Sequence, residues 1–278
     1  MSSSASPLKA SFVTVNYKMP DFIRQLFEGV EAAKWTFPFE YILVDNYSGD
    51  GVPAMVRERF PWVKVRENIN NGFGAGNNLA FREATGEYVI LLNPDLTVFP
   101  GEMEKWIEWM DAHPAVGISG PRTLNPDRSD QTSCYRFPSL LMPVYRRTFL
   151  GNTSWGKRYV KNFLMEEMDR TKEQEVDWVQ GSAMCIRRSV LEKLGGFDER
   201  FFMYLEDADL CRQVWAAGAR VAYTPVATVV HYHRRQSRIR RPWEIFRNRT
   251  ARAHIQSAIK YFLKYRGQPS PRPQQSTL

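Results

Sequence analysis

Short apolar runs alternate with stretches of helical spacing over the first 120 residues of the chain. A run of consecutive apolar residues bounded by turn signals predicts a buried strand, and apolar positions three and four apart predict an amphipathic helix. We expect strands at 12–17, 41–44, 63–65 and 88–92, and helices at 21–33, 53–60, 77–84 and 102–113. This alternation is typical of an α/β domain with a mainly parallel, doubly wound sheet and helices on both faces.

The pattern loosens after Gly120. Residues 121–176 carry several prolines and glycines without a clear period, and we expect an insertion or flexible loops that shape a binding cleft. Further on, the sequence predicts strands at 176–186 and 220–223, helices at 187–194 and 207–217, and a long basic helix at 242–265. We therefore divide the chain into a domain at 8–230 with halves 8–120 and 121–230, a basic C-terminal helical segment at 231–266, and a disordered tail at 267–278.

Composition and cysteine usage bound the class of protein. The 43% hydrophobic and 24% charged content is ordinary for a soluble globular protein, and no apolar run approaches the roughly 18 residues needed to span a bilayer. Three widely spaced cysteines, Cys134, Cys185 and Cys211, favour a reducing cytoplasm over a disulfide framework or a zinc site. The first seven residues lack the apolar core of a secretory signal, so we expect a short loose tail there.

The net charge of +8 is concentrated near the C-terminus. Residues 231–266 contain eleven arginines and lysines and one acid, whereas residues 1–230 carry a net charge of −3. Aromatic and aliphatic residues interrupt the basic ones, which favours a segment with one side packed on the domain and a basic side near an anionic lipid surface. Charge alone would also suit nucleic acid, but no nucleic-acid recognition module is visible in the sequence.

Polar residues follow three of the expected strands at the point where each one ends. They are Asn16, the pair Asp45-Asn46, and the run Asn93-Pro94-Asp95. One such cluster is often turn chemistry, because Asn, Asp and Pro favour turns. Three clusters at strand ends instead predict a ligand site, since ligands of open α/β sheets bind outside the carboxyl ends of the strands.

A glycine-rich loop at 70–78 lies between two of these clusters. Its glycines alternate with other residues and a helix N-terminus follows, an arrangement that lets backbone amides approach a phosphate or a sugar. The loop is not a dinucleotide-binding fingerprint, because that motif follows the first strand directly.

Two further features suit a divalent cation. Asp95 ends an apolar strand, where a carboxylate can hold a hard cation that also binds substrate phosphates. His231 and His233 follow the apolar run at 226–230, and side chains two apart on a strand point to the same side. Imidazole is a common ligand of metals such as Mn²⁺, although a histidine pair in a basic stretch can equally be structural.

Three carboxylates, those of Glu206, Asp207 and Asp209, crowd into four positions directly after an aromatic run and a Gly-Gly turn. A solvated acidic surface would not normally follow the sequence Phe-Phe-Met-Tyr-Leu. Carboxylates beside apolar surface have perturbed proton affinity, which is how a general base or a metal site is made. This segment is the strongest indication that the chain is an enzyme.

Taken in order along the chain, these motifs resemble those of inverting family 2 glycosyltransferases of the bacterial rhamnosyltransferase-like branch. The resemblance covers most of residues 10–265, and the ordered set is far more specific than any one motif. The matching motifs are 44–51 for nucleotide binding, 70–78 for the glycine-rich loop, 92–95 for metal binding, 178–182 and 195–199 on the acceptor side, and 206–210 for the catalytic base.

The resemblance implies a GT-A fold and a role for each motif. Asp207 would be the catalytic base, supported by Glu206 and Asp209, with Asp209 alternatively capping the following helix. Asp95 would hold Mg²⁺ or Mn²⁺ together with His231 or, alternatively, His233. Contacts to the nucleotide-sugar are expected from Thr14, Asn16, Asp45, Asn46, Asn71, Gly72, Gly74, Asn77 and Asn93. Contacts to the acceptor are expected from Trp178, Gly181, Ser182, Gly196 and Phe197.

Two positions depart from the family pattern. Asn93 stands at the first position of the metal motif, which leaves Asp95 as the only carboxylate there. The run 234–236, Arg-Arg-Gln, follows the histidine pair where relatives often have small or glycine-rich residues, and its arginines are alternative ligands for the donor phosphates.

The implied activity is inverting transfer of a sugar, with rhamnose as the first expectation, from a dTDP- or UDP-sugar to a hydroxyl of a lipid-linked or cell-surface glycan. We expect a cytoplasmic protein that associates peripherally with the inner face of the cytoplasmic membrane. Two other functions compete with this one. A sugar nucleotidyltransferase would normally carry a basic phosphate loop at the first strand, and a non-catalytic protein of the same fold would bind nucleotide or glycan without using the carboxylates.

Overall fold

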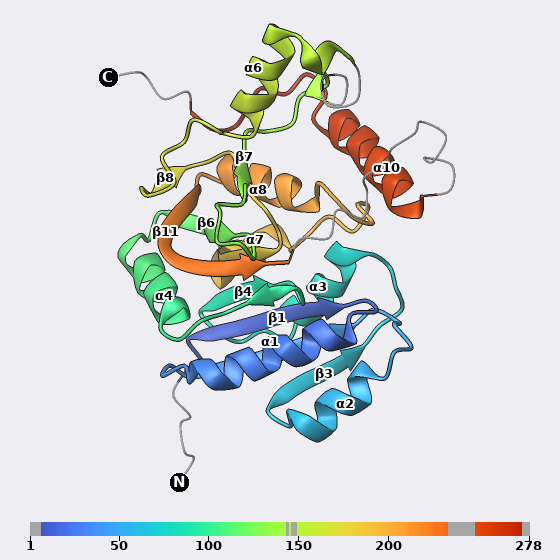
Figure 1. Cartoon of the computed structure of the whole chain (residues 1–278), viewed down its shortest axis with the longest axis vertical. Helices are drawn as coiled ribbons and strands as arrows, with labels where there is room; N and C mark the ends of the chain where they lie inside the picture. Colours follow the sequence, from blue (N-terminus) through green and yellow to red (C-terminus); the bar gives the residue numbers. More distant parts are fainter. Residues whose placement is uncertain (1–6, 143–144, 146–148, 233–247, 274–278) are drawn as a thin grey trace.

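The computed structural model describes residues 7–142, 145, 149–232 and 248–273. Within this part of the chain, nine strands form one sheet with helices on both faces (Figure 1). They are β1 Ala10–Asn16, β2 Phe39–Asp45, β3 Val63–Glu67, β4 Tyr88–Leu92, β5 Leu96–Thr97, β6 Val116–Leu124, β8 Gln174–Glu175, β10 Ala183–Arg187 and β11 Arg220–His231. Their order across the sheet is β3-β2-β1-β4-β10-β6-β11-β5, with β8 pairing on β11.

The α/β prediction is confirmed, with one difference in strand direction. Strands β3, β2, β1 and β4 are parallel, as predicted for the N-terminal half. Strand β10 then runs antiparallel between β4 and β6, and β11 is parallel to β6. The sheet is therefore mixed rather than mainly parallel, because the chain returns through β10 to the middle of the sheet.

Helices cover the two faces of the sheet and supply the apolar residues of two cores. They are α1 Pro20–Ala33, α2 Val52–Arg59, α3 Phe73–Phe81, α4 Glu102–Ala112, α6 Ser154–Phe163, α7 Arg188–Leu194, α8 Glu206–Ala216 and α10 Arg249–Lys264. Helices α1, α2 and α4 bury Leu26, Val56 and Trp106 in one core. Helices α7 and α8 bury Leu191 and Leu210 in the other.

The second half of the domain is more regular than its sequence suggested. The stretch 121–176 contains the end of β6, β7 Cys134–Tyr135, the 3₁₀ helix η1 Phe149–Asn152, α6 and β8, rather than loops alone. The stretch 176–186, predicted as one strand, forms β9 Trp178–Val179 and β10, and β9 pairs with β7 outside the main sheet. Helix α3 begins at Phe73, inside the glycine-rich loop and before its predicted start.

The described C-terminal residues pack on the domain. The predicted basic helix is described from residue 248 onward, where the Asn248 side chain accepts a hydrogen bond from Ala251 N. Residues 267–273 were expected in a disordered tail, yet Arg272 is only 8% exposed and donates to Asp177 Oδ1 at 2.7 Å. None of the helices in the described ranges is long and apolar enough to cross a bilayer.

Candidate active site

The ends of β1 and β2 bring together polar side chains that the sequence had marked. Asn16 lies opposite Asp45 in the parallel ladder, and its Nδ2 donates to Asp45 Oδ1 at 2.7 Å. The same Nδ2 lies 3.0 Å from Ser48 Oγ and 3.2 Å from Asp50 Oδ2. The sequence analysis placed Asn16 and Asp45 at one ligand site, and Asp50, from the same motif as Asp45, joins them. Two carboxylates and an amide thus form one polar cluster at the edge of the sheet.

Asn46 and Thr14 differ in their relation to this edge. Asn46 is buried under the glycine-rich loop, where its Nδ2 donates to Gly72 O at 3.0 Å and its Oδ1 accepts from Asn68 Nδ2 at 2.9 Å. Thr14 is 1% exposed, and its hydroxyl donates to Leu92 O at 2.6 Å and lies 2.8 Å from Tyr41 Oη. Thr14 therefore lies within the core, whereas Asn46 positions the loop.

The glycines of the loop allow a close approach of the segment that precedes the acidic motif. Gly72 has a φ of +114°, and a Cβ there would lie 2.2 Å from Phe202 O. A Cβ on Gly74 would lie 3.1 Å from Phe197 Cβ, and Phe73 N donates to Phe202 O at 2.9 Å. Because the first amide of α3 is bonded to protein, these glycines serve packing between the two halves.

The asparagines of the loop bond to protein in the same way. Asn71 N donates to Ile69 O at 2.8 Å, and Asn77 Nδ2 donates to Phe73 O at 2.9 Å. Asn78, which was not singled out from the sequence, holds Phe197 by both backbone groups. Its Oδ1 accepts from Phe197 N at 2.8 Å, and its Nδ2 donates to Phe197 O at 2.8 Å. This pairing ties α3 to the turn that leads into the acidic motif.

The acidic motif begins helix α8 after a strained turn. Tyr204 and Leu205 have φ values of +71° and +66°, which is costly for residues that are not glycine. Asp207 follows, and its Oδ2 accepts from Gly181 N at 3.0 Å while its Oδ1 accepts from Ala208 N at 2.8 Å. Two consecutive left-handed residues beside a buried carboxylate are typical of a functional site.

Burial gives both leading carboxylates raised pKa values. Desolvation raises the pKa of Asp207 to about 6, although the amides of Gly181 and Ala208 favour its charged form. Desolvation, followed by the charge of Asp207, raises the pKa of Glu206 well above its usual range. Within the described residues, Glu206 Oε2 is buried without a hydrogen-bond partner. A carboxylate with a pKa near neutrality is suited to accept a proton from a substrate hydroxyl.

Asp209 lies in the first turn of α8, together with Asp207. It does not cap α8, whose N-cap is Leu205, and its side chain is fully buried against the C-terminal helix. It accepts from Tyr265 Oη at 2.7 Å and pairs with Lys264 Nζ at 2.7 Å. Asp209 therefore joins α8 to α10.

Asp95 and His231 meet as the sequence predicted. Strand β11 pairs with β5 so that His231 lies opposite Leu96, and His231 Nε2 is 3.4 Å from Asp95 Oδ1. His231 Nδ1 lies 2.6 Å from Gln131 Oε1. His233, the alternative ligand, lies outside the described residues.

The hydrogen bonds of Gln131 define the tautomer of His231. Gln131 Nε2 donates to Asn125 Oδ1 at 2.8 Å, so its Oε1 faces His231 and accepts from Nδ1–H. The Nε2 atom then faces Asp95, so the two side chains are placed to share a cation. In the described ranges, no third His, Cys, Asp or Glu completes a metal-binding cluster. The pair fits a Mg²⁺ or Mn²⁺ ion whose other ligands are water and phosphate.

The turn between β9 and β10 links this pair to Asp207. Gly181 donates to Asp207, and the next residue, Ser182, accepts from Asn93 N at 2.8 Å. Asn93 lies two residues before Asp95. The base candidate and the metal-ligand candidates therefore flank the single three-residue turn 180–182.

The remaining acceptor-side residues are buried supports. Trp178 is 8% exposed, stacks on Tyr135 with ring centroids 4.5 Å apart, and donates from Nε1 to Arg136 O at 2.9 Å. Phe197 is 3% exposed and packs near Phe81, while a Cβ on Gly196 would lie 2.4 Å from Asn78 Oδ1. Trp178 and Phe197 therefore belong to the apolar core that also contains Leu210 of α8.

Comparison with known proteins gives relatives with consistent names. An N-acetylglucosaminyl-diphospho-decaprenol L-rhamnosyltransferase of Mycobacterium tuberculosis is 32% identical over 210 residues, which covers 70% of this chain and 67% of the relative. Rhamnosyltransferase WbbL of Escherichia coli is 25% identical over 261 residues, which covers 91% of this chain and 92% of the relative. The solved mannosyltransferase PcManGT of Pyrobaculum calidifontis has 20% identity and a TM-score of 0.59, covering 96% of this chain and 69% of that one.

Family models agree with these likenesses. A model of Glycosyl transferase family 21 matches residues 163–259. A model described as Glycosyl transferase family 2 matches residues 11–195, which run from within β1 to the end of α7. The candidate site residues outside this match are Gly196, Phe197, the acidic motif and the candidate metal-binding histidines. The chain belongs to glycosyl transferase family 2 and is a glycosyltransferase.

Proposed function

We propose that this glycosyltransferase moves a sugar, with rhamnose as the first candidate, from a dTDP- or UDP-sugar to a hydroxyl of a lipid-linked or cell-surface glycan with inversion at the anomeric carbon. The observation that carries the proposal is the position of Asp207. Its carboxylate is buried, has a pKa raised to about 6, and is joined through Gly181 and Ser182 to the strand end at Asn93.

Asp207 is the proposed general base. It takes the proton of the acceptor hydroxyl while that oxygen attacks the anomeric carbon and the nucleoside diphosphate leaves on the opposite side. Base assistance of this kind contributes about 10²–10⁴-fold to a rate. Burial and the charge of Asp207 raise the pKa of Glu206 well above its usual range, which favours its neutral form and keeps the pair from carrying two adjacent charges.

The donor side is proposed to use the cluster at the strand ends. Asp45 and Asn16 are the candidates for the base and ribose, and Asp95 with His231 would hold Mg²⁺ or Mn²⁺. When bound, the cation supplies charge stabilisation of the departing diphosphate. The mannosyltransferase of Pyrobaculum calidifontis was solved with GDP-Man and Mn²⁺, which supports a divalent cation at this site.

The acceptor is proposed to be presented at a membrane. The Mycobacterium tuberculosis relative is named for a diphospho-decaprenol acceptor, which supports a lipid-linked glycan. On α10, Ile259 and Leu263 are 54% and 66% exposed, and exposed Arg252 lies on the same helical stripe. Exposed Arg266 follows two residues after the helix ends. The sequence of 233–247 adds six arginines, so we infer adsorption at the cytoplasmic face of an anionic membrane.

The test is a donor panel with purified protein. A donor at about 100 times its dissociation constant should stabilise the fold by about 2.7 kcal/mol, which a thermal shift detects. We expect a Mg²⁺- or Mn²⁺-dependent shift with one dTDP- or UDP-sugar. Transfer to an N-acetylglucosaminyl-diphospho-lipid should then give a product with inverted anomeric configuration by NMR. A product with retained configuration would refute the mechanism, and no transfer by wild type under any donor would refute the activity.

A further inference from the structure

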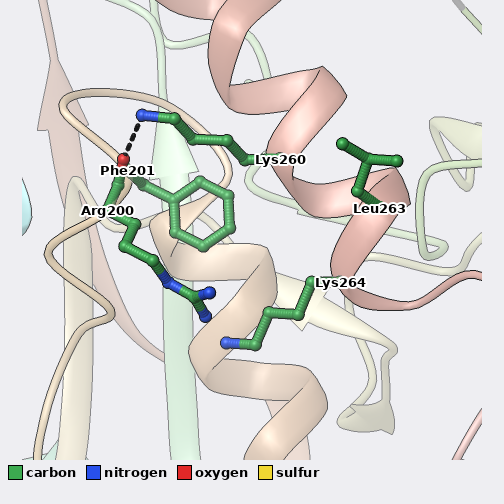
Figure 2. Close-up of a pocket in the computed structure, with 5 residues that line it drawn as sticks. All are labelled: Arg200, Phe201, Lys260, Leu263 and Lys264. Atoms are coloured by element: carbon green, nitrogen blue, oxygen red, sulfur yellow. Dashed lines mark hydrogen bonds between the residues drawn. The ribbon is translucent and has the colours of Figure 1, made fainter.

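Helix α10 contacts the segment 198–209, which ends in the acidic motif, along most of its length. Lys260 Nζ donates to Arg200 O at 2.5 Å (Figure 2). Lys264 Nζ donates to Asp198 Oδ2 at 2.8 Å. Between these contacts lies a pocket of about 450 Å³, lined by Arg200, Phe201, Lys260, Leu263 and Lys264. Two lysine side chains of α10 therefore bond to the 198–200 segment beside this pocket, while Tyr261 of the same helix is 1% exposed in the apolar core.

The middle of α10 holds the strained turn before Asp207. Ser257 is 1% exposed and its Oγ donates to Met203 O at 2.8 Å. The His254 ring stacks on Tyr204, with centroids 4.5 Å apart. Because Tyr204 is left-handed, surrounding contacts must hold it in that conformation. The contacts from α10 act on the residues that set where α8 begins.

The end of α10 acts on α8 itself. Asp209 is fully buried, and its partners at the end of α10 are Lys264 and Tyr265. A third partner is Gln213 of α8, whose Nε2 donates to Asp209 Oδ2 at 2.7 Å. One turn further along α8, Arg212 donates to Pro269 O at 2.7 Å. A buried carboxylate that loses its cation is strongly unfavourable, so this pair keeps the two helices together.

We propose that α10 positions the catalytic base, with Ser257 and Lys264 as positioning residues that hold the turn 203–205 and the first turn of α8. The proposal rests on the proposed role of Asp207. In this view the C-terminal helix is part of the catalytic apparatus, and its docking determines whether the Asp207 carboxylate faces the acceptor hydroxyl.

The charges around the acidic motif give this role a readout beyond stability. Asp207 faces Glu206 and the amides of Gly181 and Ala208, while the Asp209 carboxylate faces Lys264 and Tyr265 from α10 and adds to the raised pKa of Glu206. Beyond Lys264 lie Asp198 and its partner Arg200. Removal of Lys264 leaves Asp209 uncompensated near the base, which favours protonation of Asp207 and Glu206.

The experiment measures kcat, donor KM and the pH dependence of kcat for variants of full-length protein. Lys264→Met should lower kcat by about tenfold or more with a nearly unchanged donor KM. In the plot of kcat against pH, the fall on the acidic side should move to higher pH in this variant. Lys264→Arg should restore much of the rate. In the double variant Asp209→Asn/Lys264→Met, the acidic fall in kcat should return to the wild-type pH, because the uncompensated charge of Asp209 is gone. The maximal kcat should stay low, because the contact that docks α10 on α8 is still missing.

Two further variants keep the test independent of folding. Ser257→Ala should lower kcat although it removes only the hydrogen bond to Met203 O. Gln256→Ala, at an exposed neighbouring position, should match wild type. Wild-type kcat in Ser257→Ala, together with an acidic fall in kcat that does not move in Lys264→Met, would overturn the inference. If Asp207→Asn turns over normally, the proposed function fails instead, so the two failures are distinguishable.

Discussion

The amide of Gly181 donates to Asp207 Oδ2 at 3.0 Å, and a Cβ on that glycine would lie 3.3 Å from Asp207 Cβ. The turn between β9 and β10 therefore lies in direct contact with the Asp207 carboxylate. This contact stabilises the ionised form, which partly offsets the desolvation that raises the pKa. The balance between the two leaves a base that changes protonation close to neutral pH.

The rate of transfer is expected to depend on this protonation. Because Asp207 must be ionised to accept a proton, kcat should fall as the pH drops through about 6, the raised pKa of its carboxyl. The measurement is kcat from pH 5 to 8 at saturating donor and metal. A fall in kcat only near the ordinary pKa of aspartate would contradict a pKa raised by burial.

Asp207→Asn should be inactive and more stable than wild type above pH 7. The folded protein binds this proton more tightly than the unfolded chain, so ionisation above pH 6 costs stability that the neutral amide does not lose. We expect a gain of about 1–3 kcal/mol at pH 8 that disappears below pH 4, where both states are protonated. Urea denaturation at the two pH values measures the difference. Equal stabilities at pH 8 would show that the carboxylate is not strained by burial.

Gln131→Leu should weaken activation by the divalent cation. Gln131 accepts from Nδ1 of His231 at 2.6 Å and thereby directs the Nε2 lone pair toward Asp95. Loss of such an orienting partner typically lowers metal affinity about 10–100-fold. Titration of Mg²⁺ or Mn²⁺ against activity gives the half-saturating concentration. Gln131→Glu keeps an acceptor and serves as the control, so equal weakening in both variants would argue against an orienting role.

Gly72→Ala and Gly51→Ala separate steric overlap from backbone strain. Both glycines have positive φ, but a Cβ on Gly51 meets nothing within 4 Å, whereas one on Gly72 would lie 2.2 Å from Phe202 O. We expect Gly51→Ala to cost about 1 kcal/mol and Gly72→Ala about 3 kcal/mol or more, with a lower kcat. Thermal unfolding of the pair measures this difference. Similar losses would mean that the loop does not need to approach the 197–202 segment closely.

Binding to lipid should depend on the exposed side of α10. Co-sedimentation with vesicles should be stronger for anionic than for neutral lipid and should weaken with added salt. Ile259→Ser/Leu263→Ser should reduce binding, whereas Ile69→Ser, at a residue 67% exposed on the N-terminal half, should not. Equal binding to both kinds of vesicle would remove the basis for a membrane-bound acceptor.

The sequence predicted the parts of the site whose signals are local. Asp45 and Asp95 follow strongly apolar runs, so the strand pattern alone places them at the carboxyl edge of the sheet. The acidic motif at Asp207 was equally visible from the apolar residues before it. Such features depend on period and on adjacent residues, which one sequence contains in full.

Long-range partners were not predictable in this way. Gln131 lies 100 residues from His231, and Lys264 lies 55 residues from Asp209, with no local pattern that links either pair. For the same reason, the glycines at 72 and 74 suggested a phosphate loop, because the segment that packs against them lies more than a hundred residues later. The insertion of β10 beside β4 is likewise set by tertiary pairing rather than by strand propensity.

Strand β10 also limits how this enzyme can be recombined with its relatives. Its residues 183–187 pair with 92–88 of β4, so the second half of the domain supplies the strand that covers the edge of the N-terminal half. A fragment ending at residue 120 would expose β4 as an unpaired, wholly apolar edge, which invites aggregation. Chimeras that exchange donor specificity by a cut between the halves should therefore carry their own β10, and a crossover beyond residue 187 respects that requirement.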